Sequence, residues 1–162
     1  MIEIKSIESF KTGYEFKSFD CGNDELNRYF KTFALINNKN NLSRTFVGIE
    51  NKQILGFITL CNAQIEFKEM PHEYQKSNPR YPIPAVKIAR FAVDKKCQGM
   101  GIGTKLLKFA FSKVLQIALN SGTKVVVVNA KAESKEFYEK FGFINLTDNT
   151  LVLFVETLIK AL

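Results

Sequence analysis

The sequence predicts an α/β fold, a mixed and mostly antiparallel central sheet with helices on both faces. Three observations lead to this prediction. Two apolar runs, residues 45–50 and 54–60, flank the dipeptide Asn51-Lys52, which suits a two-residue hairpin turn. Strand, helix, strand, helix and strand patterns then follow in the second half of the chain. The length of 162 residues, 46% of them hydrophobic, fits a single domain over residues 1–162.

In the first half, residues 2–4 are a candidate strand and a helix is expected after Asn23. The Asn23 side chain suits the N-cap, and Asp24 and Glu25 would then lie in the first turn. Apolar residues recur at helical spacing and predict a core face made of Leu26, Tyr29, Phe30, Phe33 and Ala34. The second hairpin strand is expected to continue towards Phe67.

In the second half, an irregular segment with all four prolines precedes a strand at residues 86–93. A long helix with one broad apolar face is expected after the glycine-rich residues 98–103. Four consecutive valines at residues 125–128 predict a strand that is covered on both faces. A short helix follows, with Ser134 as a candidate N-cap and Gly142 as its C-terminal stop. Residues 151–155 are the expected closing strand.

The stretch between the strand ending at Val93 and the long helix predicts a cradle for a diphosphate. Gly99, Gly101 and Gly103 stand at alternate positions, which lets the backbone adopt positive φ and bring bare N–H groups to a ligand. The helix that follows points its positive N-terminus at the same place. The spacing fits neither a P-loop nor a dinucleotide-binding turn.

Charge and cysteine content narrow the class of protein. The net charge of +7 favours a polyanionic partner, and Lys95, Lys96, Lys105 and Lys108 flank the glycine loop. Three distant cysteines and one histidine, His72, predict neither a disulfide framework nor a metal site. Without a signal peptide or a long apolar run, we expect a soluble, cytoplasmic protein that does not bind a membrane.

The glycine loop resembles the coenzyme A loop of the Gcn5-related N-acetyltransferases (GNAT). Gln98, Gly101 and Gly103 fill the pattern Arg/Gln-x-x-Gly-x-Gly/Ala, and residues 137–143 resemble the Phe-Tyr-x-x-x-Gly-Phe segment of that superfamily. The resemblance implies acetyl-CoA as co-substrate, without a metal, and Tyr138 as the catalytic general acid for the coenzyme thiolate. The residues expected to bind the cofactor are Phe91, Ala92, Val93, Gln98, Gly99, Met100, Gly101, Ile102, Gly103, Thr104 and Asn129.

Residues 19–26, 45–47 and 81–94 look like the acetyltransferase toxins of bacterial toxin–antitoxin pairs. Those enzymes acetylate the α-amine of aminoacyl-tRNA, block translation and are restrained by a small ribbon-helix-helix antitoxin. The resemblance therefore implies an aminoacyl-tRNA substrate and such an antitoxin as partners. The candidate tRNA contacts are Lys31, Arg44, Arg80, Lys87 and Arg90.

The residues themselves favour direct transfer to an amine of low pKa. An α-amine has a pKa of about 7.7 to 8.0 and needs little help to lose its proton. Accordingly, residues 86–93 contain no Asp or Glu that would serve as base. Acetyl-CoA is expected between the strands ending at Val93 and Asn129, with backbone N–H groups near Ala92 and Val93 holding the oxyanion. Cys97 lacks a histidine pattern that would activate it as a covalent nucleophile.

Two other functions stay open from the sequence. The first is an ordinary GNAT enzyme that acetylates a small-molecule amine or a protein N-terminus. The second is a non-catalytic regulator that binds coenzyme A or RNA. The oligomeric state is also open, and a homodimer is one of the options.

Overall fold

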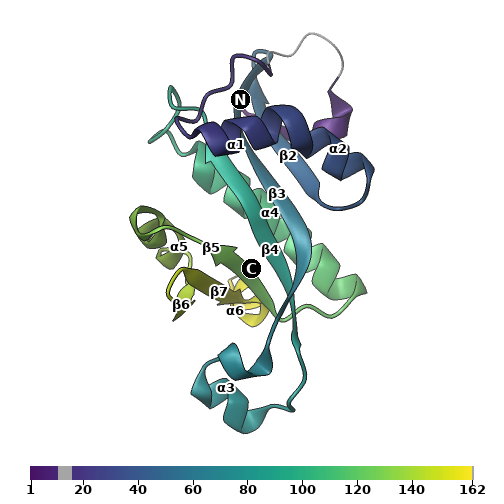
Figure 1. The fold of residues 1–162 in the computed structure, drawn as a ribbon, viewed down its shortest axis with the longest axis vertical. Coiled ribbons are helices and arrows are strands. Elements are labelled where there is room, and N and C mark those ends of the chain that lie inside the picture. Colours follow the sequence, from purple (N-terminus) through teal and green to yellow (C-terminus); the bar gives the residue numbers. More distant parts are fainter. Residues whose placement is uncertain (11–15, 162) are drawn as a thin grey trace. The chain divides into compact units, whose positions relative to one another are not determined.

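The computed structural model describes residues 1–10 and 16–161, which form a mixed α/β fold (Figure 1). Seven strands hydrogen-bond into one sheet in the order β1-β2-β3-β4-β5-β7-β6. Their bounds are β1 Glu3–Ser6, β2 Arg44–Glu50, β3 Gln53–Ile65, β4 Ile83–Val93, β5 Val125–Asn129, β6 Ile144–Thr147 and β7 Thr150–Phe154. β4 and β5 pair in parallel, whereas β1 with β2, β2 with β3, β5 with β7 and β6 with β7 are antiparallel. The predicted mixed, mostly antiparallel sheet is confirmed.

The helices are α1 Asp24–Arg28, α2 Ala34–Lys39, α3 His72–Ser77, α4 Ile102–Asn120, α5 Lys135–Glu139 and α6 Val155–Lys160. The described residues group into two compact units. The first unit comprises residues 1–61 and 89–110, and the second comprises residues 62–88 and 111–162. The chain passes between the units within β3, β4 and α4. The expectation that residues 1–162 act as one domain stays a prediction.

The core of the first unit lies between its helices and the β2–β3 hairpin. Phe30 stacks on Phe57 of β3 with ring centroids 4.5 Å apart, and Ala34 and Val47 are completely buried in the same cluster. The hairpin turn is the predicted one, because Asn51 and Lys52 both have positive φ, 51° and 63°. The predicted helix start is also confirmed, since Asn23 Oδ1 accepts a hydrogen bond from Leu26 N at 3.0 Å.

A π-helical turn corrects one prediction for the first unit. The 3.6-residue pattern assigned Phe33 to the core face, but this side chain is 42% exposed. Residues 29–33 form the π-helix η2 between α1 and α2, and its wider i→i+5 turn inserts one extra residue. Phe33 is thereby rotated away from the face that buries Phe30 and Ala34.

The second unit contains the valine strand and three elements that the sequence analysis did not predict, namely α3, β6 and α6. Val155, expected in the closing strand, is instead the first residue of α6. All four valines of β5 are buried, as expected for a strand covered on both faces. The proline-containing segment was expected to be irregular but includes α3, whose Tyr74 packs 6.2 Å from Phe154. β6 forms a hairpin with β7. It has four mostly exposed residues, which are too few to show an alternating hydrophobic pattern.

The predicted long helix is α4, which begins at Ile102 and therefore includes the last glycine of the predicted loop, Gly103. Its buried side chains include Leu106, Leu107 and Val114, which belong to the predicted apolar face. Within residues 1–10 and 16–161, no helix is both long and apolar enough to cross a membrane.

Candidate functional site

The glycine loop joins β4 to α4 and is held in a compact turn. Cys97 N donates to Asp94 O at 2.8 Å, and Met100 N donates to Cys97 O at 3.3 Å. Gly99 and Gly101 both have φ near +82°, a conformation that side chains other than glycine rarely adopt. Gly103 lies in the first turn of α4 without positive φ, so only two of the three glycines are needed for the backbone path.

Six consecutive or near-consecutive backbone N–H groups of this loop have no hydrogen-bond acceptor among the described residues. They belong to Gln98, Gly99, Gly101, Ile102, Gly103 and Thr104. A Cβ placed on Gly99 or Gly101 would meet no atom within 4 Å, so the space over the loop is open. Free N–H groups at the N-terminus of a 19-residue helix are a site for an anion. This geometry agrees with the predicted diphosphate cradle.

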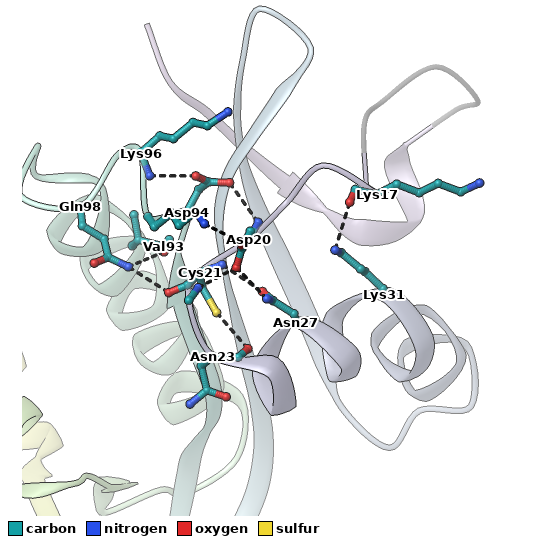
Figure 2. Close-up of polar contacts among 12 residues, drawn as sticks. Lys17, Asp20, Cys21, Asn23, Asn27, Lys31, Val93, Asp94, Lys96 and Gln98 are labelled. Carbon is teal, nitrogen blue, oxygen red and sulfur yellow. Dashed lines mark hydrogen bonds and ion pairs between the residues drawn. The ribbon is translucent and has the colours of Figure 1, made fainter.

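Asp94 connects this loop to the segment before α1 (Figure 2). One carboxylate oxygen, Oδ1, accepts from Lys96 N at 2.9 Å, and Oδ2 accepts from Asp20 N at 3.1 Å. A bond in the opposite direction runs from Lys95 N to Asp20 O, at 2.8 Å. Asp94 is only 8% exposed, so both of its oxygens are committed inside the protein.

The side chain of Gln98 has a structural task that the motif did not reveal. Its Nε2 donates to Val93 O at 3.0 Å and to Cys21 O at 3.2 Å, so both amide hydrogens are used by the protein's own backbone (Figure 2). The hydrogen-bond donor that Gln98 can still offer to a ligand is its backbone N–H.

The end of β4 is packed tightly against β3. A Cβ added to Gly56 would lie 2.8 Å from Ala92 O, so only glycine allows this approach. Asp94 N donates to Leu55 O at 2.8 Å and extends the contact beyond Val93. Ala92 is buried, whereas Phe91 and Val93 are half-buried. The backbone at the predicted oxyanion position is therefore held firmly within the first unit.

An ion pair and a thiol lie at the loop. Lys95 Nζ lies 2.9 Å from Asp20 Oδ2, and this hydrogen bond is the main reason why the pKa of Asp20 falls below its usual range. The same contact raises the pKa of Lys95, which stays cationic. Burial and then the charge of Asp94 raise the pKa of the Cys97 thiol. A thiol with a raised pKa is a weaker nucleophile at neutral pH, which disfavours a covalent route.

Tyr138 and Asn129 belong to the second unit. Tyr138 is 7% exposed and packs edge-to-face against Phe137 and Phe143, with ring centroids 5.3 Å and 5.4 Å away. Burial raises its pKa, so the phenol keeps its proton throughout the physiological range. Ser134 precedes this helix at the N-cap position without the predicted side-chain bond. Asn129 ends β5, and its Oδ1 accepts from Thr150 Oγ1 at 3.1 Å.

The five candidate tRNA contacts differ in how their charges are used. The Arg44 guanidinium donates to Asn38 O and to Asn41 Oδ1, both at 2.7 Å, and so closes the turn between α2 and β2. Arg90 lies 4.9 Å over the ring of Tyr29 and donates to Ala89 O at 2.8 Å. Lys31 donates to Lys17 O, at 3.0 Å. The other two candidates, Arg80 and Lys87, lie in the second unit.

Sequence reasoning missed Asp20, Asn27 and the pairing of Tyr29 with Arg90. Local patterns could not have paired them, because Asp20 and Asp94 are 74 positions apart. Within the described residues, no group of three His, Cys, Asp or Glu side chains could hold a metal ion, and all three cysteines are free.

Comparisons with known proteins find a matching family model and similar sequences. The family model for an acetyltransferase (GNAT) domain matches residues 41–145. A tRNA-acetylating toxin of Mycobacterium tuberculosis (strain H37Rv) is 33% identical over 133 residues, which are 81% of this chain and 80% of that protein.

Similar solved structures include two that cover nearly the whole chain. AtaT complexed with acetyl-methionyl-tRNAfMet has a TM-score of 0.91 and 28% identity, covering 99% of both chains. A tyrosine-to-phenylalanine mutant of the AtaT toxin, bound to the C-terminus of the antitoxin AtaR and to acetyl-CoA, has a TM-score of 0.83 and 25% identity. That likeness covers 99% of this chain and 97% of the AtaT chain.

Proposed function

We propose that this chain, which belongs to the GNAT acetyltransferase family, transfers the acetyl group of acetyl-CoA to the α-amine of an aminoacyl-tRNA. The observation that carries the proposal is the likeness to a tRNA-acetylating toxin over 81% of the chain, combined with a preformed loop of free N–H groups. The product would be an N-acetylated aminoacyl-tRNA, and translation would stop for lack of a free amine.

The loop between β4 and α4 is the proposed binding site for the diphosphate of acetyl-CoA. The free N–H groups of Gln98 to Thr104 would donate to its oxygens, and the N-terminus of α4 would add its positive dipole. The open space over Gly99 and Gly101 lets a phosphate approach the backbone directly. Bound acetyl-CoA supplies an activated thioester, and no metal takes part in this proposal.

The proposed chemistry is direct attack of the acceptor amine on the thioester carbonyl. β4 carries no carboxylate, which suits an α-amine whose pKa of about 7.7 to 8.0 leaves a usable fraction unprotonated. The backbone N–H groups near Ala92 and Val93 are the proposed oxyanion donors. Tyr138 is the proposed proton donor to the coenzyme thiolate, because burial keeps its hydroxyl protonated. The proton that the amine loses passes through water to solvent, from which Tyr138 regains its own. Asn129 is proposed to bind acetyl-CoA as well.

Arg90 is the most favourable of the proposed tRNA contacts. The ring of Tyr29 and the carbonyl of Ala89 fix its guanidinium, so little side-chain entropy is lost when the remaining N–H groups bind a phosphate. Arg44 fits less well, because Asn38 and Asn41 already accept from its guanidinium. Lys31 and Lys87 would add to the affinity as point charges, and Arg80 as a planar donor of several N–H groups.

A partner antitoxin is part of the proposal. A similar toxin has been solved with the C-terminus of its antitoxin bound, and the sequence resemblance implies a ribbon-helix-helix protein in that role. Because charged tRNA is a cytoplasmic substrate, we propose that the enzyme acts in the cytoplasm. Inhibition of translation upon expression, relieved by co-expression of the antitoxin, would follow.

The test is transfer of radiolabelled acetyl groups from acetyl-CoA to purified tRNA. Aminoacylated tRNA should be labelled at its α-amine, whereas uncharged tRNA should stay unlabelled. The apparent affinity for aminoacyl-tRNA should fall steeply between about 50 and 200 mM salt, since phosphate contacts release counterions.

A matched pair of variants tests the tRNA contact. Arg90→Gln should weaken use of aminoacyl-tRNA and lower the salt slope by about 1. Arg28→Gln removes the same charge from another arginine that lies over an aromatic ring, Phe33, and should have little effect. Label on small amines or peptides without salt dependence would instead indicate an ordinary GNAT enzyme. Binding of acetyl-CoA without any transfer would indicate a regulator.

A further inference from the structure

Two carboxylates stand beside the loop that we propose binds a diphosphate. Asp94 begins the loop, and Asp20 lies against it through the bond from Lys95 N to Asp20 O. Negative charges at this place repel an anionic ligand and lower its affinity. A purely electrostatic view therefore predicts that removing either carboxylate strengthens binding.

We propose that Asp94 is a positioning residue, which preforms the loop for the cofactor by locking it to the segment before α1. This inference rests on the proposed function. Its carboxylate bridges two chain segments, because Oδ1 accepts from Lys96 N in the loop and Oδ2 accepts from Asp20 N across from it. The two backbone N–H groups each need an acceptor oxygen, and among side chains of this length only a carboxylate has two.

The far side of this lock is itself fixed to α1 (Figure 2). Asn27 Nδ2 donates to Asp20 Oδ1 at 2.9 Å, and Asn27 Oδ1 accepts from Cys21 N, also at 2.9 Å. The Gln98 side chain closes the other end of the loop on Cys21 O. The segment that the loop contacts is therefore itself bonded to α1, at both Asp20 and Cys21.

These contacts explain why the loop keeps one conformation although most of its backbone N–H groups have no hydrogen-bond acceptor in the described part of the chain. If the lock opens, the loop samples other conformations, and only the fraction with the correct shape can bind. The apparent dissociation constant then rises in inverse proportion to that fraction. Once acetyl-CoA is bound, the loop has the same conformation as in the wild type, so the rate of acetyl transfer at saturating acetyl-CoA is unchanged.

Asp94→Asn tests the sign of this effect. The amide can accept from Lys96 N or from Asp20 N but not from both, so one bond is replaced by two facing donors. We expect the dissociation constant for coenzyme A, measured by calorimetry, to rise about tenfold or more. The KM for acetyl-CoA should rise in parallel while kcat stays within about twofold. Asp24→Asn removes an equal charge from the exposed first turn of α1 and should leave binding unchanged.

Hydrogen exchange separates a positioning role from a general loss of structure. In Asp94→Asn without ligand, the hydrogen-bonded loop amides of Cys97 and Met100 should exchange faster than in the wild type, and saturating coenzyme A should slow them again. Gln98→Met is an exposed change that removes the bonds to Cys21 O and to Val93 O, and it gives a second variant should Asp94→Asn not fold. It should weaken coenzyme A binding in the same way, with kcat retained.

Binding by Asp94→Asn that equals or exceeds that of the wild type would overturn the inference and support the electrostatic view. A fall in kcat with unchanged KM would also overturn it. A wild-type protein that binds no coenzyme A would instead refute the proposed function, and the two failures are therefore distinguishable.

Discussion

Replacing Gly101 by alanine separates the backbone requirement of the loop from its proposed ligand. Gly101 has φ +82°, where an L side chain costs roughly 1 to 2 kcal/mol, and the added methyl meets no atom within 4 Å. Part of this cost is offset because alanine restricts the unfolded chain. We therefore expect a loss of about 1 kcal/mol in the free energy of unfolding, or about 2 to 4 °C in Tm.

The same methyl should have a larger effect on acetyl-CoA. It would stand in the open space over N–H groups that we propose bind the diphosphate, and each lost hydrogen bond to a charged oxygen costs about 1.5 to 3 kcal/mol. Affinity should therefore fall about tenfold to a hundredfold for one lost bond. Isothermal calorimetry with acetyl-CoA and thermal unfolding without it measure the two effects separately.

Gly22 provides the matched control. It has φ +87° and open space around its Cα, so Gly22→Ala carries the same backbone strain. Its N–H bond to Asp20 Oδ1, 2.8 Å long, is left in place by the added methyl. We expect an equal loss of stability with acetyl-CoA binding retained. If Gly101→Ala lost no more affinity than Gly22→Ala, the loop would not be the diphosphate site.

Two further predictions concern Tyr138. Tyr138→Phe should bind acetyl-CoA normally and lose roughly 10²- to 10⁴-fold in single-turnover rate, as for a positioned general acid; an unchanged rate would leave the tyrosine with packing alone. Because burial raises the pKa of Tyr138 above its unfolded value of about 10, its contribution to stability is complete below about pH 10 and is lost as the pH rises through the folded pKa. Urea unfolding at about pH 9 and pH 11 should therefore show a smaller alkaline loss for Tyr138→Phe than for the wild type, by up to about 1.4 kcal/mol per pH unit. Tyr81→Phe changes an exposed tyrosine and should behave as the wild type does.

Local patterns in the sequence predicted the elements whose causes are local. The Asn51-Lys52 turn, the Asn23 cap and the valine strand depend on backbone conformation, capping or burial within a few residues, and each was found as expected. The exposed position of Phe33 was missed because a π-turn shifts the helical register, and no residue preference marks such a turn. α3 was missed because nearby prolines favour irregular structure, although its residues 72–77 contain none.

For the candidate site, the sequence by itself determined the location of the loop, the positive φ of Gly99 and Gly101 and the attachment to a helix N-terminus, whereas Gly103 was found in the helix. These properties follow from residues 94–104 alone, because φ preferences and the helix dipole act over a few residues. Only the tertiary structure decided which side chains support the loop. Asp20 reaches Asp94 across 74 positions, and Gln98 reaches Cys21 across 77, contacts that exist only when the chain is folded. In the folded protein, Arg44 donates to the turn after α2, and Arg90 lies over the ring of Tyr29. These contacts, and not the residue type, decide which guanidinium can still bind a ligand.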